Sequence, residues 1–142
     1  MYEYSVFWIK EDIAKHYFHK SDILYRFIKA YQKSHDRIDL KKQYDYITND
    51  FPETELISHM KNYHLNNVAV QVEGSQIKLN KNLHLISLHI SEKHLKFRCE
   101  TLQDAEETLF PILRQFQSIL FIIGNNIENY GWISPVPYIS KY

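Results

Sequence analysis

The sequence predicts an α+β protein built on a mainly antiparallel sheet of about five to six strands, packed with about four to five helices. The sequence does not distinguish a purely antiparallel sheet from a mixed sheet that also contains parallel strand pairs. The first residues alternate like a strand, and apolar residues then recur at helical spacing as far as residue 63. From Val68 the spacing becomes that of strands joined by short turns. We expect residues 1–136 to form a single domain and residues 137–142 to form a C-terminal surface tail.

The first 63 residues are expected to form one strand and four helices. Tyr2–Ile9 is bulky throughout and alternates well enough for a strand, and Lys10–His19 follows as a short helix. Ser21 and Asp22 are residue types common at helix N-caps, and they predict the start of a second helix. The second, third and fourth helices are expected over Ile23–Tyr31, Asp39–Ile47 and Pro52–Tyr63.

After residue 67 the chain is expected to form mostly strands. The spacing predicts a hairpin around Gly74, two further strands, a helix capped by Thr101, and two closing strands. Pro111 lies inside that helix, so we expect a kink or an early end there. The strands are expected over Val68–Val72, Gln76–Leu79, Leu85–Ile90, Leu95–Cys99, Ser118–Ile123 (a central strand) and Tyr130–Val136, and the helix over about Leu102–Gln117.

The opening helix has two neighbouring apolar lines. Ile13 and Tyr17 are four residues apart, and Ala14 and Phe18 form a second line about 100° round the helix. One line is enough to attach a short helix to a core. The other line is either additional core or a surface for a partner. In the second case Ala14 and Phe18 should be buried, with Ile13 and Tyr17 at least partly exposed.

Composition excludes several classes of function. The 142 residues include 17 basic and 17 acidic side chains, so the basic excess of a general nucleic-acid binder is missing. The longest apolar run, Ile119–Ile123, is too short to span a bilayer. A single cysteine and an N-terminus unlike a signal peptide suit a cytoplasmic location. Aromatic residues are abundant at 15%, as in protein interfaces or an aromatic core.

Catalytic motifs are absent from the sequence. Three glycines, widely spaced, exclude a glycine-rich phosphate loop. Cys99 lies on a predicted strand facing the same way as Leu95 and Phe97, which favours a buried structural residue over a nucleophile. His16 and His19 lie three apart on a predicted helix and could share a metal ion. His84, His89 and His94 recur every five residues on predicted strands, so their side chains would not converge without a bulge. No cofactor or metal ligand set is therefore expected, and a binding module is favoured over an enzyme.

Three segments together resemble one protein family. Tyr4–Phe18, with the core Ile-Lys-Glu, then Ala, then His-Tyr-Phe, resembles the N-terminus of the sporulation inhibitor of replication family, SirA. Lys42–Thr48 is similar to that family's K-Q-x-x-Y-I-T segment, and Tyr130–Val136 to its closing Y-G-W-[LI]-x-P-V motif. The three motifs occur in the family's order and span nearly the whole chain, although about residues 49–117 match weakly.

The resemblance implies a binding function. Members of the family are not enzymes, and they bind domain I of the replication initiator DnaA to restrain replication during sporulation. Carried over by position, the family's contact surface implies Ile13, Tyr17 and Gln43 as partner-binding residues. An aromatic residue is expected in the family where this chain has Ile13, so ring area is lost there. Tyr130–Trp132 is expected to be structural, with Gly131 allowing close approach or an unusual φ.

Two further hypotheses stay open at this stage. The first is a small metal-binding enzyme that uses the histidines, and the second is a regulator that binds a small molecule. For the favoured hypothesis we expect a one-to-one complex with DnaA domain I, without direct nucleic-acid binding, membrane association or a small-molecule substrate.

Overall fold

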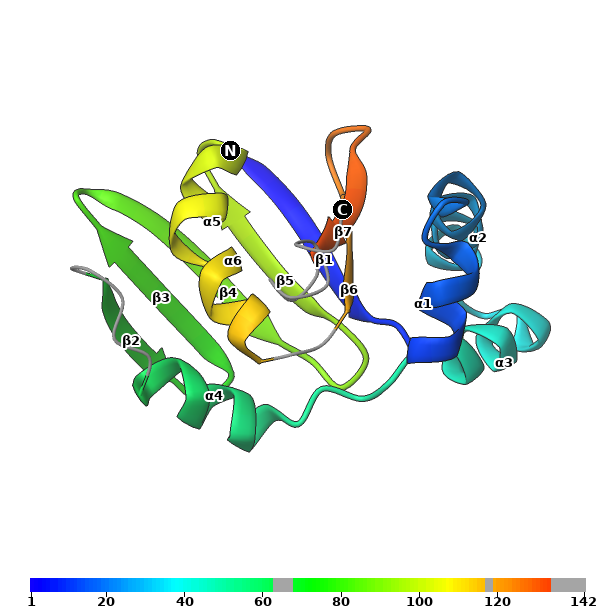
Figure 1. The fold of residues 1–142 in the computed structure, drawn as a ribbon, viewed down its shortest axis with the longest axis horizontal. Coiled ribbons are helices and arrows are strands. Elements are labelled where there is room, and N and C mark those ends of the chain that lie inside the picture. The colour runs from blue at the N-terminus through cyan, green and yellow to red at the C-terminus, as the bar shows by residue number, and fades with distance from the viewer. Residues whose placement is uncertain (63–67, 117–118, 134–142) are drawn as a thin grey trace.

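The computed structural model describes residues 1–62, 68–116 and 119–133. Over these residues the chain forms one seven-stranded sheet and six helices, which confirms the α+β class (Figure 1). All of the strand pairs described are antiparallel. Both counts exceed the prediction by one. The seven strands correspond to the seven strand segments expected along the chain, which the stated range of five to six undercounted, and the additional helix follows from a break before Pro111.

The first strand lies inside the sheet. Strand β1 (Tyr2–Trp8) is hydrogen-bonded between β5 and β6 in the order β2-β3-β4-β5-β1-β6-β7. Its residues Tyr4, Val6 and Phe7 are all buried, because helices cover both faces of the sheet at this position. The bulky composition of the first strand is thereby explained. The other strands are β2 (Ala69–Glu73), β3 (Gln76–Lys81), β4 (His84–Ile90), β5 (Leu95–Cys99), β6 (Leu120–Gly124) and β7 (Tyr130–Ile133).

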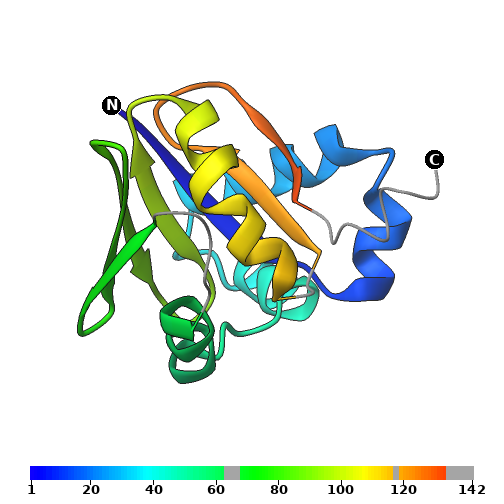
Figure 2. The ribbon, with the colours of Figure 1, turned by 60° about the vertical axis from the view of Figure 1, so that its left-hand side comes forward.

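Helices pack on opposite faces of the sheet at its two ends (Figures 1 and 2). Helices α4 (Glu53–Asn62), α5 (Leu102–Thr108) and α6 (Phe110–Gln115) lie over β2 to β5, where they enclose the larger core. Helices α1 (Glu11–Tyr17), α2 (Ser21–Lys33) and α3 (Ile38–Ile47) pack at the β1–β6–β7 end around a second core. Because α1 to α3 cover only that end, much of the same face over β3 to β5 carries exposed polar side chains.

The predicted long helix divides into α5 and α6. The Thr101 hydroxyl accepts a hydrogen bond from the Asp104 N–H at 3.2 Å, which confirms the predicted cap. Pro111 lies at the start of α6, where a missing N–H is tolerated, so the predicted early end is confirmed. The expected ends of this helix and of the next strand, Gln117 and Ser118, lie outside the described residues.

Several local predictions are wrong. The second helix begins at Ser21 itself, so Lys20 occupies the N-cap and no side-chain cap bond forms. A methyl group added to Gly131 would meet no atom within 4 Å beyond its chain neighbours, and its φ is not positive, so the backbone there does not require glycine. Strands β3 and β4 extend further than expected because a two-residue turn of Asn82 and Leu83, with φ of 50° and 70°, joins them directly.

Some predicted segments are not described. Tyr63, Ser134–Val136 and the predicted tail 137–142 lie outside the described residues. No helix in the described ranges is long and apolar enough to cross a membrane.

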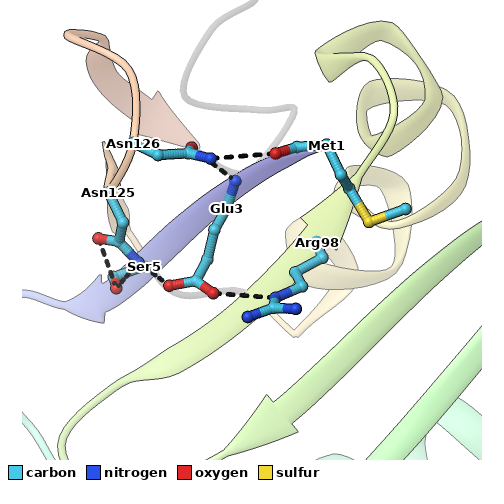
Figure 3. Close-up of polar contacts among 6 residues, drawn as sticks. All are labelled: Met1, Glu3, Ser5, Arg98, Asn125 and Asn126. Atoms are coloured by element: carbon cyan, nitrogen blue, oxygen red, sulfur yellow. Dashed lines mark hydrogen bonds and ion pairs between the residues drawn. The ribbon is translucent and has the colours of Figure 1, made fainter.

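A polar network attaches the start of β1 to the turn after β6 (Figure 3). The Asn125 amide nitrogen donates to the Glu3 carboxylate at 3.0 Å and to the Ser5 hydroxyl at 2.9 Å. The Arg98 guanidinium donates to the other Glu3 oxygen at 2.9 Å, and Asn126 bonds the Glu3 N–H at 3.0 Å. Burial acts to raise the pKa of Glu3, but the hydrogen bonds from Asn125 and Arg98 outweigh it, so its pKa is lowered.

This network predicts a pH dependence of stability. Because the folded-state pKa of Glu3 is lowered, its contribution is fully present above the ordinary value of 4.5 and is lost as the pH falls through the folded value. Urea unfolding should therefore show Glu3→Gln to be less stable than the wild-type protein at neutral pH. The difference should narrow at strongly acidic pH. A difference of equal size at both pH values would contradict this role of the carboxylate.

Candidate functional site

Helix α1 is joined to the end of α3 by backbone hydrogen bonds. The Lys10 N–H donates to the Ile47 carbonyl at 2.9 Å, and the Asn49 N–H donates to the Trp8 carbonyl at 2.7 Å. An isolated bridge between Ile9 and Thr48 lies between these bonds. Two segments about forty residues apart in the chain are thus held side by side. This arrangement brings the first helix beside the segment that contains Gln43.

The two apolar lines of α1 have different environments. Ala14 is fully buried, as predicted, whereas Ile13 and Tyr17 are half-buried and pack at the margin of the second core. The prediction that Ile13 and Tyr17 are partly exposed is therefore confirmed. Phe18 is only half-buried, so its predicted burial is wrong. Helix α1 ends at Tyr17, and the Phe18 ring stacks on Trp132 of β7, with ring centroids 5.5 Å apart.

A groove of about 360 Å³ lies between α1, α2 and α3, and we call it the three-helix groove. Helix α1 contributes Ile13 and Tyr17 to its lining, and α3 contributes Gln43. All three residues implied by the family resemblance therefore line the same depression. The remaining lining residues are Ile23, Leu24, Phe27, Tyr46 and Ile47, from α2 and α3.

The floor and the rim of the groove differ in exposure. Leu24 is 3% exposed, whereas the rim residues Ile23 and Tyr46 are 44% and 64% exposed. The Lys10 ammonium lies 5.0 Å from the centroid of the Tyr46 ring, which is a cation–π contact. The His16 ring meets Tyr17 edge to face at 4.7 Å. These contacts orient Tyr17 on the wall and Tyr46 on the rim, while large apolar side chains stay open to solvent.

Two rim residues, Ile23 and Tyr46, were missed by the sequence reasoning. Tyr46 lies three residues after Gln43, which places both on one face of α3. That spacing would have identified Tyr46 once Gln43 was chosen. Ile23 lies four residues before Phe27, and apolar residues at this helical spacing indicate the core face of a helix. Only the packing of α2 against α1 shows that the pair also borders an open groove.

The groove is chemically suited to hold apolar side chains. Its lining is aliphatic and aromatic, with the Gln43 amide and two phenolic hydroxyls as polar groups. Lysine, arginine, aspartate and glutamate are not among the lining residues described. Such a composition matches the centre of a protein interface, where aromatic residues are enriched and charges are depleted.

The candidate catalytic and metal-binding residues do not converge. In residues 1–62, 68–116 and 119–133, no group of three or more His, Cys, Asp or Glu side chains could hold a metal ion. Cys99 is buried together with Leu95 and Phe97, as predicted. Burial raises the pKa of the Cys99 thiol to about 11, which disfavours the reactive thiolate. The groove is thus the strongest candidate site that these residues form.

Comparison with family models gives a match over nearly the whole chain. A family model described as the sporulation inhibitor of replication protein SirA matches residues 2–137. No curated protein matched the chain. The family match covers both ends of the chain, including the segments that carry α1 and α3. The match and the motifs agree, and this protein belongs to the SirA family of sporulation inhibitors of replication.

Proposed function

We propose that this protein inhibits the initiation of replication by binding domain I of DnaA, one to one, through the three-helix groove. The observation that carries the proposal is the convergence of Ile13, Tyr17 and Gln43 on one apolar depression. These residues come from helices separated by 20 intervening positions or more in the sequence, so their proximity is a property of the fold. The family match supports inhibition of replication as the outcome of binding.

The proposed contact has an apolar centre and a polar rim. Burying the half-exposed Tyr17 and Ile13 against a partner would remove apolar surface from water, which favours association. The Gln43 amide, exposed beside them, can hydrogen-bond a partner's backbone. Lys10 and the exposed ion pair of Lys15 with Glu11 lie on α1 or at its start, where charges act mainly on association rate and specificity.

The neutral overall charge agrees with a protein target instead of DNA. We propose that the protein acts in the cytoplasm as a binding inhibitor and not as an enzyme. The metal-enzyme alternative has no converging donor set among the described residues, so no observation favours it. At Ile13 the aliphatic side chain supplies an apolar anchor with less area than the aromatic residue expected in the family.

Purified protein mixed with DnaA domain I tests the proposal directly. Calorimetry should show saturable one-to-one association at concentrations up to tens of micromolar. Gln43→Ala should weaken it by about threefold to tenfold, because one interfacial hydrogen bond is lost. Gln71→Ala changes an exposed glutamine on β2, away from the groove, and should leave the affinity unchanged. Absence of association at tens of micromolar would exclude the proposed function.

A further inference from the structure

A second, larger cavity lies on the opposite side of α3 from the groove. This polar cleft, of about 730 Å³, separates α2 and α3 from β1, β5 and the turn that joins β4 to β5. Its volume is in the range of sites for drug-sized ligands. The family motifs place no function here, and the sequence alone indicates no pocket. The cleft lies where α2 and α3, which supply Ile28 and Tyr44 to the second core, face the sheet beside that core.

The floor of the cleft is a built polar surface. Ser5 is 1% exposed, and its hydroxyl is bonded to Asn125 at 2.9 Å, within the network that also binds Glu3 (Figure 3). Phe7 continues this floor toward α3 and contacts the ring of His94 at 6.2 Å between centroids. Ordered polar groups at the base of a cavity are the feature that fixes ligand orientation in binding sites.

Two lysines flank this floor. Lys96 lies opposite Ser5 in the β1–β5 register. From the other side, the Lys29 ammonium of α2 donates to the Gly124 carbonyl at 3.0 Å, next to Asn125. In the part of the chain that the structure describes, neither lysine is in an ion pair with a carboxylate. Lys96 acts electrostatically on the Glu3 carboxylate, but neither ammonium group is bonded directly to a carboxylate.

Two of the three carboxylates that line the cleft are held in ion pairs. Arg98 pairs with Glu3 at 2.9 Å, and Lys41 pairs with Asp45 at 2.8 Å. The third carboxylate, Glu92, is in no ion pair among the described residues and is only the last of the causes that raise the pKa of Lys41, after the hydrogen bond of that lysine to Asp45. The fourth lining lysine, Lys93, is neutralised by Asp50 at 2.7 Å. The two lysines without an ion pair, Lys29 and Lys96, outnumber the one lining carboxylate without an ion pair, Glu92, so the cleft keeps a net positive charge.

An aromatic wall lines the same cleft. Tyr31 of α2 is half-buried and stacks on the buried Tyr44 of α3, with centroids 4.3 Å apart and planes 19° apart. The Tyr44 hydroxyl is bonded to the Lys93 carbonyl at 3.2 Å, which fixes this pair against the turn between β4 and β5. A fixed, partly exposed ring favours a flat ligand group, because aromatic surfaces associate by stacking or edge contacts.

We infer that the polar cleft binds a small organic anion in which a flat ring is joined, directly or through a short linker, to a phosphate or carboxylate group. The anionic group lies between Lys29 and Lys96 above Ser5, and the ring lies along the wall formed by Tyr31. An inorganic ion alone would fill little of the cleft and would leave the aromatic wall unused. The site is distinct from the three-helix groove.

The two cavities share α3. Gln43 and Tyr46 line the groove, whereas Lys41, Tyr44 and Asp45 line the cleft. A ligand that repositions α3 would change the groove, and the partner would change ligand affinity by the same factor. This coupling between ligand and partner rests on the proposed function, but the binding of the ligand to the cleft does not. The test therefore uses the protein without DnaA.

AMP, adenosine and inorganic phosphate separate the contributions of ring and charge. In ¹H–¹⁵N NMR titrations of the full chain, AMP should shift the amide signals around Ser5 and Lys96 saturably at millimolar concentrations or below. Phosphate and adenosine should each bind at least about tenfold more weakly. Lys96→Ala should weaken AMP binding about tenfold, as expected for one lost charge-assisted hydrogen bond, and Lys96→Glu should abolish it.

Lys78→Ala is the matched control, since Lys78 is an exposed lysine on β3 that does not line the cleft. It should leave AMP binding unchanged. The inference is overturned if AMP causes no saturable shift, if phosphate binds as tightly as AMP, or if Lys96→Ala and Lys78→Ala have equal effects. Each result is independent of whether DnaA domain I binds the groove.

Discussion

Tyr17→Ala should weaken binding of DnaA domain I by roughly thirtyfold or more. Tyr17 lies on the wall of the three-helix groove, and its ring is half-buried in the free protein. Tyrosines at the centre of an interface often contribute about 2 kcal/mol or more when truncated, and 1.4 kcal/mol corresponds to a factor of ten. The edge contact from His16 holds the ring in place before binding, which reduces the entropy lost on association.

The variant should remain folded. Tyr17 packs at the margin of the second core, so its loss should cost about 1–2 kcal/mol of stability, which circular dichroism and urea unfolding would measure. Tyr17→Phe keeps the ring and should retain most of the affinity. Tyr2→Ala removes a 40% exposed tyrosine at the far end of β1 and should not affect binding. If Tyr17→Ala and Tyr2→Ala bind equally well, the groove is not the binding site.

Phe97→Ala should destabilise the protein by about 3–5 kcal/mol. Phe97 is 1% exposed on β5, and its ring stacks on Tyr4 at 5.3 Å and meets Phe110 edge to face at 6.0 Å. The substitution leaves a cavity where the sheet meets α6, in addition to the lost burial of the ring. Domains of this size are stable by only about 5–15 kcal/mol, so much of the folded population could be lost on mild heating.

Urea unfolding followed by circular dichroism measures this effect. Leu85→Ala provides the control, because Leu85 is 41% exposed on the neighbouring strand β4 and should change stability by about 0.5 kcal/mol or less. Phe97→Leu preserves part of the side-chain volume, so its loss of stability should lie between those of Phe97→Ala and Leu85→Ala. A cost below about 1 kcal/mol for Phe97→Ala would mean that this core repacks around the missing ring, contrary to the expectation for a close-packed interior.

Much of the fold was predictable because the relevant signals are local. The alternation in β1, the helical spacing in α2 and the cap at Thr101 each depend on residues close in sequence. The break before Pro111 follows from the chemistry of one residue. Phe18 shows where such reasoning fails. Its spacing places it on the buried line of α1, but the helix ends first, and the ring stacks on Trp132, more than a hundred residues away.

The candidate site also has features that the sequence predicted and features that it did not. Helical spacing identified the second apolar line on α1, and the family motifs pointed to Gln43 as its companion. Spacing could not show that Ile23 and Phe27 of α2 complete the groove, because a helix face that borders both a core and a cavity has the pattern of a core face. The polar cleft left no local signal, since its lysines belong to a helix and to a strand.

The order of residues was enough to predict the α+β class, the position of most strands and helices and the family, and it suggested the three residues of the proposed contact. Only the folded chain shows that these three residues share one groove, that Phe18 lies outside the buried core, and that Lys29 and Lys96 flank a second cavity. The difference comes from the range of the interactions. Periodicity and capping act within a few residues of the chain, whereas grooves and clefts depend on how whole helices pack against a sheet.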